Sequence, residues 1–209
     1  MYDHTPTDFW EDFYASRPTP IQPAPNARLT ESVADLTAGD ALDLGSGNGG
    51  DAIWLARRGW SVTAIDTSPT AVERLNSVAS ALRLRGSLVA VRGDLEESFP
   101  EGGFDLISAH YLHTPLGLDR VRVLRTAAGA LHPGGHLLVV DHGSTVPWSW
   151  NRDPDARFPH PEEVYEELEL DPALWTPERV EAVQRTATGP GGQTAVVTDH
   201  VLLIRRTVH

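Results

Sequence analysis

Short runs of mostly apolar residues alternate along the chain with longer stretches of helical periodicity. The short runs have the length of buried strands and lie at 41–45, 61–66, 87–92, 104–109 and 136–141. The longer stretches predict helices near 50–59, 69–84, 118–131 and 161–169. This alternation predicts an α/β fold class, a doubly wound and mostly parallel sheet with helices on both faces.

The end of the chain departs from that alternation. Residues 180–188 and 193–206 both have the pattern of long strands, and the turn GPGG at 189–192 joins them. A glycine-rich tight turn between two strands predicts an antiparallel hairpin. We find no internal repeat and no break in composition, so we expect 1–209 to form a single domain.

The first 26 residues differ in kind from the core expected at 27–209. Aromatic side chains gather at 9–14, and prolines at 18, 20, 23 and 25 favour an extended, stiff segment before a helix at about 28–36. Two interpretations stay open. The segment is either a spacer that wraps the domain or a lid whose aromatic residues close over a pocket.

Composition excludes several kinds of chemistry. The chain has a formal net charge of -12, which disfavours nucleic acid as a partner. It contains no Lys and no Cys, so a Schiff base, a phosphate-loop lysine, a cysteine nucleophile and a disulfide framework are all excluded. The N-terminus lacks the pattern of a signal peptide, and no apolar run has the roughly 20 residues that cross a bilayer. We therefore expect a cytoplasmic protein, either monomer or homodimer, without a membrane partner.

A glycine cluster directly follows the first predicted strand, and Asp66 ends the second. Glycines there let the backbone approach a ligand, and a carboxylate at the end of the next strand can bind a ribose diol. The spacing GxGxxG keeps an NAD-dependent oxidoreductase in view. Asp43 and Asp51 argue against it, because carboxylates suit a cationic amino group better than a pyrophosphate.

Several segments together resemble one family. LDLGSGNG at 42–49, VTAIDTSP at 62–69, GDL at 93–95, FDLISAHYLH at 104–113 and LHPGGHLLVVD at 131–141 resemble the motifs of class I S-adenosylmethionine-dependent methyltransferases of the small-molecule type. The resemblance implies a Rossmann-like, seven-stranded sheet with an antiparallel C-terminal strand. It also implies S-adenosyl-L-methionine as the cofactor.

Carried over by position, the resemblance places the two strand-end acids at opposite ends of that cofactor. Asp43 would lie near the ammonium group, Asp66 on the ribose hydroxyls and Asp94 at the adenine. The full implied set of cofactor-binding residues is Asp43, Gly45, Ser46, Gly47, Asp66, Thr67, Asp94, Leu95 and His110. Two alternatives stay open: Asp94 caps a helix, or Asp43 pairs with buried backbone donors.

Methyl transfer needs an aligned acceptor and, for a hydroxyl or thiol, a base. We expect His113, in the loop after the fourth strand, to be that base or a hydrogen-bonding partner of the acceptor; simple packing under the lid is the alternative. His110, His113 and His142 also suggest a metal site, but strand-end loops do not enforce ligand geometry, and we expect none. Acceptor contacts are expected from Trp10, Tyr14, His113, His142, Trp148 and Arg152.

The sequence thus predicts transfer of a methyl group to a small molecule, with oxygen favoured over nitrogen or sulfur as acceptor atom. Two alternatives remain beside it. One is a regulatory module that binds S-adenosylmethionine without transferring the methyl group, and the other is the NAD-dependent oxidoreductase.

Overall fold

The computed structural model describes residues 5–18, 23–114, 117–149 and 157–208. Its centre is one seven-stranded sheet. The strands are β1 Asp40–Leu44, β2 Ser61–Asp66, β3 Ser87–Arg92, β4 Phe104–His110, β5 Leu131–His142, β6 Trp175–Thr188 and β7 Thr194–Arg206. The helices are α1 Pro6–Ala15, α2 Ala27–Val33, α3 Gly50–Arg57, α4 Pro69–Ala81, α5 Arg120–Gly129 and α6 Pro161–Glu167.

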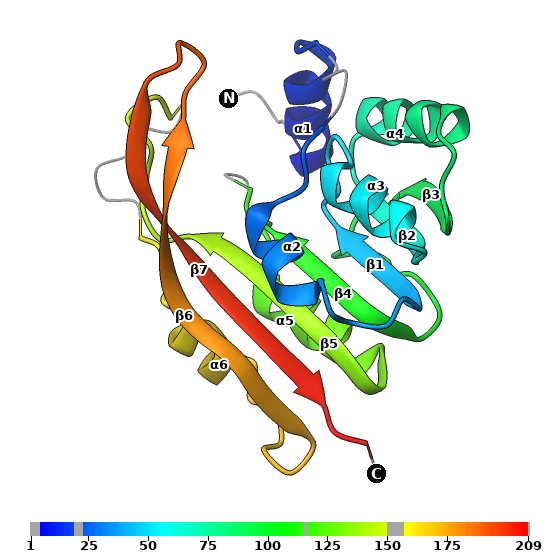
Figure 1. Ribbon diagram of the computed structural model, residues 1–209, viewed down its shortest axis with the longest axis vertical. Helices are drawn as coiled ribbons and strands as arrows, with labels where there is room; N and C mark the ends of the chain where they lie inside the picture. The colour runs from blue at the N-terminus through cyan, green and yellow to red at the C-terminus, as the bar shows by residue number, and fades with distance from the viewer. Residues whose placement is uncertain (1–4, 19–22, 115–116, 150–156, 209) are drawn as a thin grey trace.

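The strand order is β3-β2-β1-β4-β5-β7-β6. The first five strands are mutually parallel, whereas β7 runs antiparallel to β5 and to β6 (Figure 1). The predicted α/β sheet and its antiparallel C-terminal hairpin are therefore confirmed. Because strand order reverses between β1 and β4, their carboxyl ends leave a crevice at the edge of the sheet.

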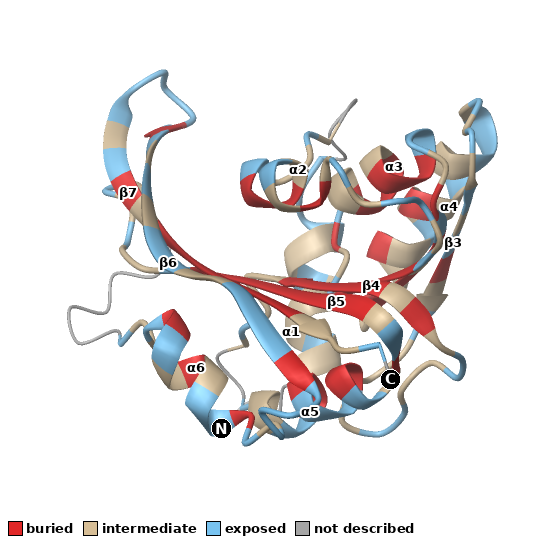
Figure 2. Ribbon diagram, turned by 60° about the horizontal axis from the view of Figure 1, so that its bottom comes forward, coloured by how far each residue is buried: buried red, intermediate tan, exposed pale blue. Residues whose placement is uncertain are grey.

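Both faces of the sheet are buried, as the continuous apolar strands require. Along β5, Leu137 and Val139 face the core beneath α5 and α6, while Leu138 and Val140 face the core beneath α2, α3 and α4. Figure 2 shows the buried strands between these two helical layers. Packing on both faces fixes the ends of the strands, so the residues at those ends are held in place.

The structure contains one helix that the sequence did not predict and moves several element boundaries; the strand expected at 180–188, for example, begins at Trp175. The chain forms a helix, α1, within the segment expected to be a spacer or lid, because Thr5 and Asp8 form a capping box and Pro6 occupies the first helical turn. The helix expected to extend to residue 131 ends at Gly129, since Leu131 already pairs with Phe104 as part of β5. Of the prolines expected in an extended segment, those at 18, 23 and 25 lie outside any helix or strand, and the proline at 20 lies outside the described residues.

Among the described residues, no helix combines the length and the apolar character needed to cross a membrane.

Candidate functional site

A cavity of about 670 Å³ opens where β1, β2 and β4 end. Twelve of the residues predicted for the site line it. They are Trp10, Tyr14, Asp43, Gly45, Ser46, Gly47, Asp66, Thr67, Asp94, Leu95, His110 and His113. Those at or near the ends of strands, such as Asp43, Asp66 and His110, are distant in the sequence and meet where neighbouring parallel strands end.

The glycine loop after β1 forms the floor of the cavity. Gly45, Gly47 and Gly49 have φ angles of 68°, 51° and 75°, a region that side chains other than glycine's seldom adopt. The carboxylate of Asp66 accepts hydrogen bonds from the backbone N–H of Gly47 at 2.8 Å and of Ser68 at 2.9 Å. The loop and the acid at the end of β2 thus form one hydrogen-bonded unit.

Asp43 is the most deeply buried of the acids that line the cavity, with 3% of its surface exposed. One of its oxygens accepts a hydrogen bond from the Ser108 hydroxyl at 2.9 Å. Burial, reinforced by the nearby charge of Asp51, raises the pKa of Asp43 to about 7. A carboxylate held in such a place is stabilised by any cationic group that enters the cavity beside it.

A second pair lies beside Asp43. The Nδ1 atom of His110 is 2.5 Å from Oδ2 of Asp51, whose Oδ1 accepts a hydrogen bond from the Asn26 backbone N–H. The other imidazole nitrogen of His110 is buried and has no hydrogen-bond partner among the residues that the structure describes. The donor set of this corner therefore combines carboxylates with a histidine nitrogen that is free to contact a ligand. It fits the ammonium and carboxylate groups of an amino acid.

The contacts of Asp94 are not those of a helix cap. Its carboxylate accepts a hydrogen bond from the Glu96 backbone N–H at 2.9 Å, within a turn that no helix follows directly. Asp66 and Asp94 therefore both offer carboxylates to the cavity from neighbouring strand ends, β2 and β3.

His113 lies on the opposite wall and contacts a buried acid. Its Nε2 atom is 3.0 Å from Oδ1 of Asp141, the penultimate residue of β5. Arg120 donates to the other oxygen of Asp141 at 2.5 Å. Although burial raises the pKa of Asp141, the contacts with His113 and Arg120 outweigh it and hold that pKa below its usual value. The carboxylate is thus ionised and fixed, and it orients the imidazole.

Aromatic residues of α1 form part of the wall of the cavity. Trp10, Phe13 and Tyr14 all line it, and their rings pack against one another at centroid distances of 5.2 to 6.3 Å. The helix is tied to α4 through Glu11, which accepts hydrogen bonds from the hydroxyl groups of Ser68 and Thr70. These contacts explain why α1 lies over the glycine loop.

The structure places two of the predicted acceptor residues outside the wall of the cavity. His142 stacks on Tyr111, with ring centroids 4.1 Å apart, so Tyr111 separates it from the cavity. Trp148 packs beside Gly189 at the turn between β6 and β7. Arg152 lies outside the described residues. Within the described part of the chain, no cluster of histidines and acids has the arrangement of a metal site.

Sequence reasoning did not single out three residues of this site for a role. Asp141 and Glu11 act through partners that only the folded chain brings near, so nothing in the sequence marks them. Asn26 carries a readable signal, because it precedes α2 directly and its side chain caps that helix.

Comparison with known proteins gives a consistent family. Residues 42–139 match the family model described as "Methyltransferase domain". A curated relative from Amycolatopsis mediterranei, 27-O-demethylrifamycin SV methyltransferase, is 36% identical over 64% of this chain and 49% of its own length. The chain spans about half the length of the first curated relatives it matches.

Two solved structures share the fold over nearly the whole chain. One, described in work on conversion of a disulfide bond into a thioacetal group during echinomycin biosynthesis, is 25% identical, with a TM-score of 0.71 over 96% of this chain and 93% of its own. The other is the N-methyltransferase NodS from Bradyrhizobium japonicum WM9 in complex with S-adenosyl-L-homocysteine. It is 20% identical, with a TM-score of 0.64 over 97% of this chain and 99% of its own.

Proposed function

We propose that this chain is a class I S-adenosylmethionine-dependent methyltransferase and that it transfers a methyl group to an oxygen atom of a small-molecule acceptor. The proposal is supported by two groups of residues that lie together at one cavity. One cavity holds the strand-end acids Asp43 and Asp66, which suit the cofactor, and His113 paired with Asp141, which suits deprotonation of an acceptor.

S-adenosyl-L-methionine is the cofactor of this family, and bound in the cavity it supplies a methyl group on a sulfonium. We propose that Asp43 holds its ammonium group, with Gly45 and Ser46 beside the amino-acid portion. Asp66 and Thr67 bind the ribose, and Asp94 with Leu95 binds the adenine. His110 contacts the amino-acid end through the nitrogen that Asp51 does not engage.

The residues of this chain then contribute position and a base. Methyl transfer proceeds in line, so holding the acceptor atom about 3 to 3.5 Å from the methyl carbon supplies most of the acceleration. Because Nε2 of His113 faces Asp141, the proton of the neutral imidazole resides on Nε2. Nδ1 is then the atom that accepts the acceptor's hydroxyl proton, and the charged acid stabilises the imidazolium that forms.

The acceptor is an uncharged molecule with a flat, apolar body. The apolar residues Trp10, Phe13, Leu112 and Leu118 line the same cavity as His113. Among the described residues that line the cavity there is no arginine, and the sequence has no lysine. Among the described lining residues, an acceptor carboxylate would therefore find no arginine or lysine to pair with, while an aromatic ring bearing a hydroxyl group would find both a surface and a base.

Two steps test the proposal. S-adenosyl-L-homocysteine and NAD are compared by thermal shift, and only the former should stabilise the protein. A library of neutral phenols, benzoates and amines is then incubated with isotopically labelled S-adenosylmethionine. Labelled phenol ethers support the proposal, whereas labelled amines would move the acceptor atom to nitrogen. Cofactor binding with no labelled product from any class would instead favour a regulatory module. Size-exclusion chromatography decides between monomer and homodimer.

A further inference from the structure

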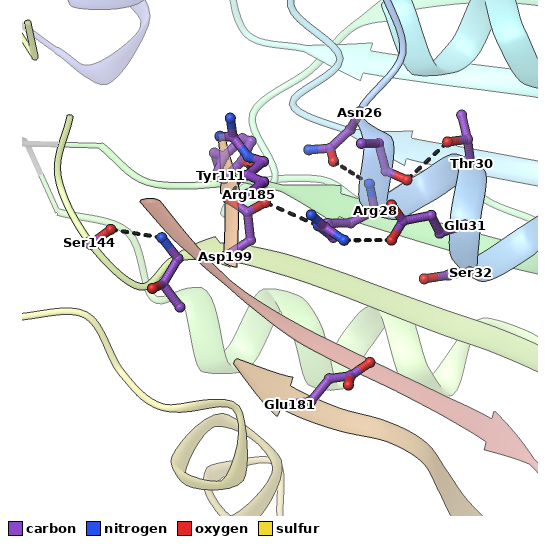
Figure 3. Close-up of polar contacts among 12 residues, drawn as sticks. Asn26, Arg28, Thr30, Glu31, Ser32, Tyr111, Ser144, Glu181, Arg185 and Asp199 are labelled. Carbon is purple, nitrogen blue, oxygen red and sulfur yellow. Dashed lines mark hydrogen bonds and ion pairs between the residues drawn. The ribbon is translucent and has the colours of Figure 1, made fainter. Parts of the chain in front are cut away.

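The buried carboxylate of Asp199, on the C-terminal hairpin, contacts residues from α2, from β6 and from the end of β4. Asp199, on β7, is 1% exposed. Its carboxylate accepts hydrogen bonds from Nε of Arg28 at 3.1 Å, from Nε of Arg185 at 2.7 Å and from the hydroxyl of Tyr111 at 3.1 Å. Figure 3 shows the arginines and the tyrosine converging on this acid from α2, β6 and the end of β4.

The charged groups of this cluster pair with one another. Arg28 pairs with Asp199 and with Glu31, and Arg185 pairs with Asp199. Neither arginine lines the cavity, so neither is placed to bind a ligand there. Buried ion networks contribute little net stability compared with apolar packing, because their desolvation is costly. What such a network does provide is a fixed geometry for the groups it holds.

Tyr111 connects the Asp199 cluster to the cavity. It has a φ of 51°, in the left-handed region that residues with a side chain rarely adopt. Tyr111 is one of the residues that line the cavity, its ring stacks on His142, and its hydroxyl donates to Asp199. Since Tyr111 lies between His110 and the loop that carries His113, its conformation sets the direction of both histidines.

The second branch reaches the same corner through α2. Arg28 is fixed by Asp199, and its backbone N–H donates to the capping side chain of Asn26. The Asn26 backbone N–H in turn donates to Asp51, the partner of His110. Both branches that leave Asp199 therefore end beside His110.

We infer that Asp199, outside the cavity, is a positioning residue that fixes the amino-acid corner of the cofactor site through Tyr111 and α2. This inference rests on the proposed function only in taking the corner as the place of the cofactor's amino-acid portion. It extends the site to the hairpin formed by β6 and β7.

The substitution Tyr111→Phe removes the tether and keeps the ring against His142. Tyr165→Phe, on α6 and against the core on the other face, removes a hydroxyl without touching the cluster and is the matched control. Titration calorimetry with S-adenosyl-L-homocysteine should show affinity about tenfold weaker for Tyr111→Phe, equal to about one net charged hydrogen bond, and unchanged affinity for Tyr165→Phe. Asp199→Asn should weaken binding in the same direction; if it does not fold, Tyr111→Phe decides.

A second readout separates positioning from simple destabilisation. In proteins with ¹³C-labelled histidine, the His110 resonance should shift in Tyr111→Phe and stay in place in Tyr165→Phe. Loss of thermal stability with wild-type affinity and an unmoved His110 resonance would overturn the inference. A wild-type protein that binds S-adenosyl-L-homocysteine but methylates nothing would overturn the transferase proposal and leave this inference standing. Failure of the wild type to bind it would overturn both.

Discussion

The hydroxyl of Tyr14 lies directly over Gly47: a methyl group on residue 47 would come within 2.5 Å of its oxygen. The contact joins the N-terminal helix to the glycine loop at the point where Gly47 donates to Asp66. Burial, together with the charge of Asp66, raises the pKa of Tyr14, so its hydroxyl stays protonated and can donate. Because Gly47 has no side chain, the loop can adopt its left-handed conformation and Tyr14 can lie against it.

Gly47→Ala should destabilise the protein and weaken its affinity for S-adenosyl-L-homocysteine. The left-handed conformation alone costs alanine about 1 to 2 kcal/mol, and Tyr14 must also move. Gly129→Ala is the control, because an added methyl group there meets nothing within 4 Å and the residue is helical. It should stabilise the protein by about 0.5 to 1 kcal/mol. Urea unfolding and calorimetry measure both effects, and equal behaviour of the two variants would contradict the packing described.

Asp66→Ala should weaken cofactor binding by about 1 to 3 kcal/mol, because a pair of buried hydroxyls loses a charged acceptor. The same change leaves the Gly47 N–H without its partner, so the loop should also loosen. Asp40→Ala, which removes an exposed carboxylate from the opposite end of β1, is the control. Calorimetric titration with S-adenosyl-L-homocysteine should separate the two variants. Unchanged affinity in Asp66→Ala would remove this acid from the site.

Asp43→Asn should make the free protein more stable at pH 8 while weakening its cofactor affinity by about 2 kcal/mol. Burial raises the pKa of Asp43 from 3.8 to about 7, so the folded protein binds this proton more tightly than the unfolded chain does. The free energy of unfolding therefore falls as the pH rises between those two values, and asparagine removes that loss.

Chemical unfolding at pH 4 and pH 8 measures this difference. Asp171→Asn, an exposed acid in the turn after α6, controls for the change in net charge. A variant at position 43 that is less stable than wild type at both pH values would refute the electrostatic account of this site.

His113→Asn should lower turnover by about 100-fold or more, as loss of a general base does, and leave S-adenosyl-L-homocysteine affinity within about twofold. Asp141→Asn should also lower turnover, since the imidazole loses the carboxylate that orients it. His132→Asn, in a half-exposed histidine that pairs with Asp105 away from the cavity, is the control. Equal turnover in His113→Asn and wild type, with the acceptor found by the library screen, would reject the role of base.

The central sheet was readable from the sequence because each parallel strand is buried on both faces and is bounded by turn residues. The predicted strands 61–66 and 87–92 match β2 and β3 residue for residue. The edge of the cavity followed from topology alone, since carboxyl ends of neighbouring parallel strands must meet. Topology placed the glycine loop and Asp66 at that edge, and the family resemblance added the expected positions of Asp43 and His110.

Contacts between distant segments of the chain could not be predicted from the sequence. His113 and Asp141 are joined only because β4 and β5 pair, with His110 opposite Val140. Helix α1 had a local signal, the capping pair Thr5 and Asp8, which the prolines and aromatic residues that follow obscured. For His142, position at a strand end was insufficient, because Tyr111 lies between it and the cavity.

Glu11→Gln should release S-adenosyl-L-homocysteine faster, by about fivefold, if α1 closes the cavity. Although desolvation opposes it, hydrogen bonds from Ser68 and Thr70 lower the pKa of Glu11. A lowered pKa means that the contact stabilises the docked helix above the ordinary carboxyl pKa of 4.5 and is lost as the pH falls further. Lowering the pH of the wild type well below 4.5, through the lowered pKa of Glu11, should therefore reproduce the effect of the substitution.

Stopped-flow displacement of S-adenosyl-L-homocysteine measures this rate. Asp12→Asn changes the neighbouring, exposed acid on the same helix and should release the ligand at the wild-type rate. If Glu11→Gln and Asp12→Asn release it equally fast, α1 covers the site without gating it. The aromatic residues Trp10 and Phe13 would then act only as a fixed wall for the acceptor.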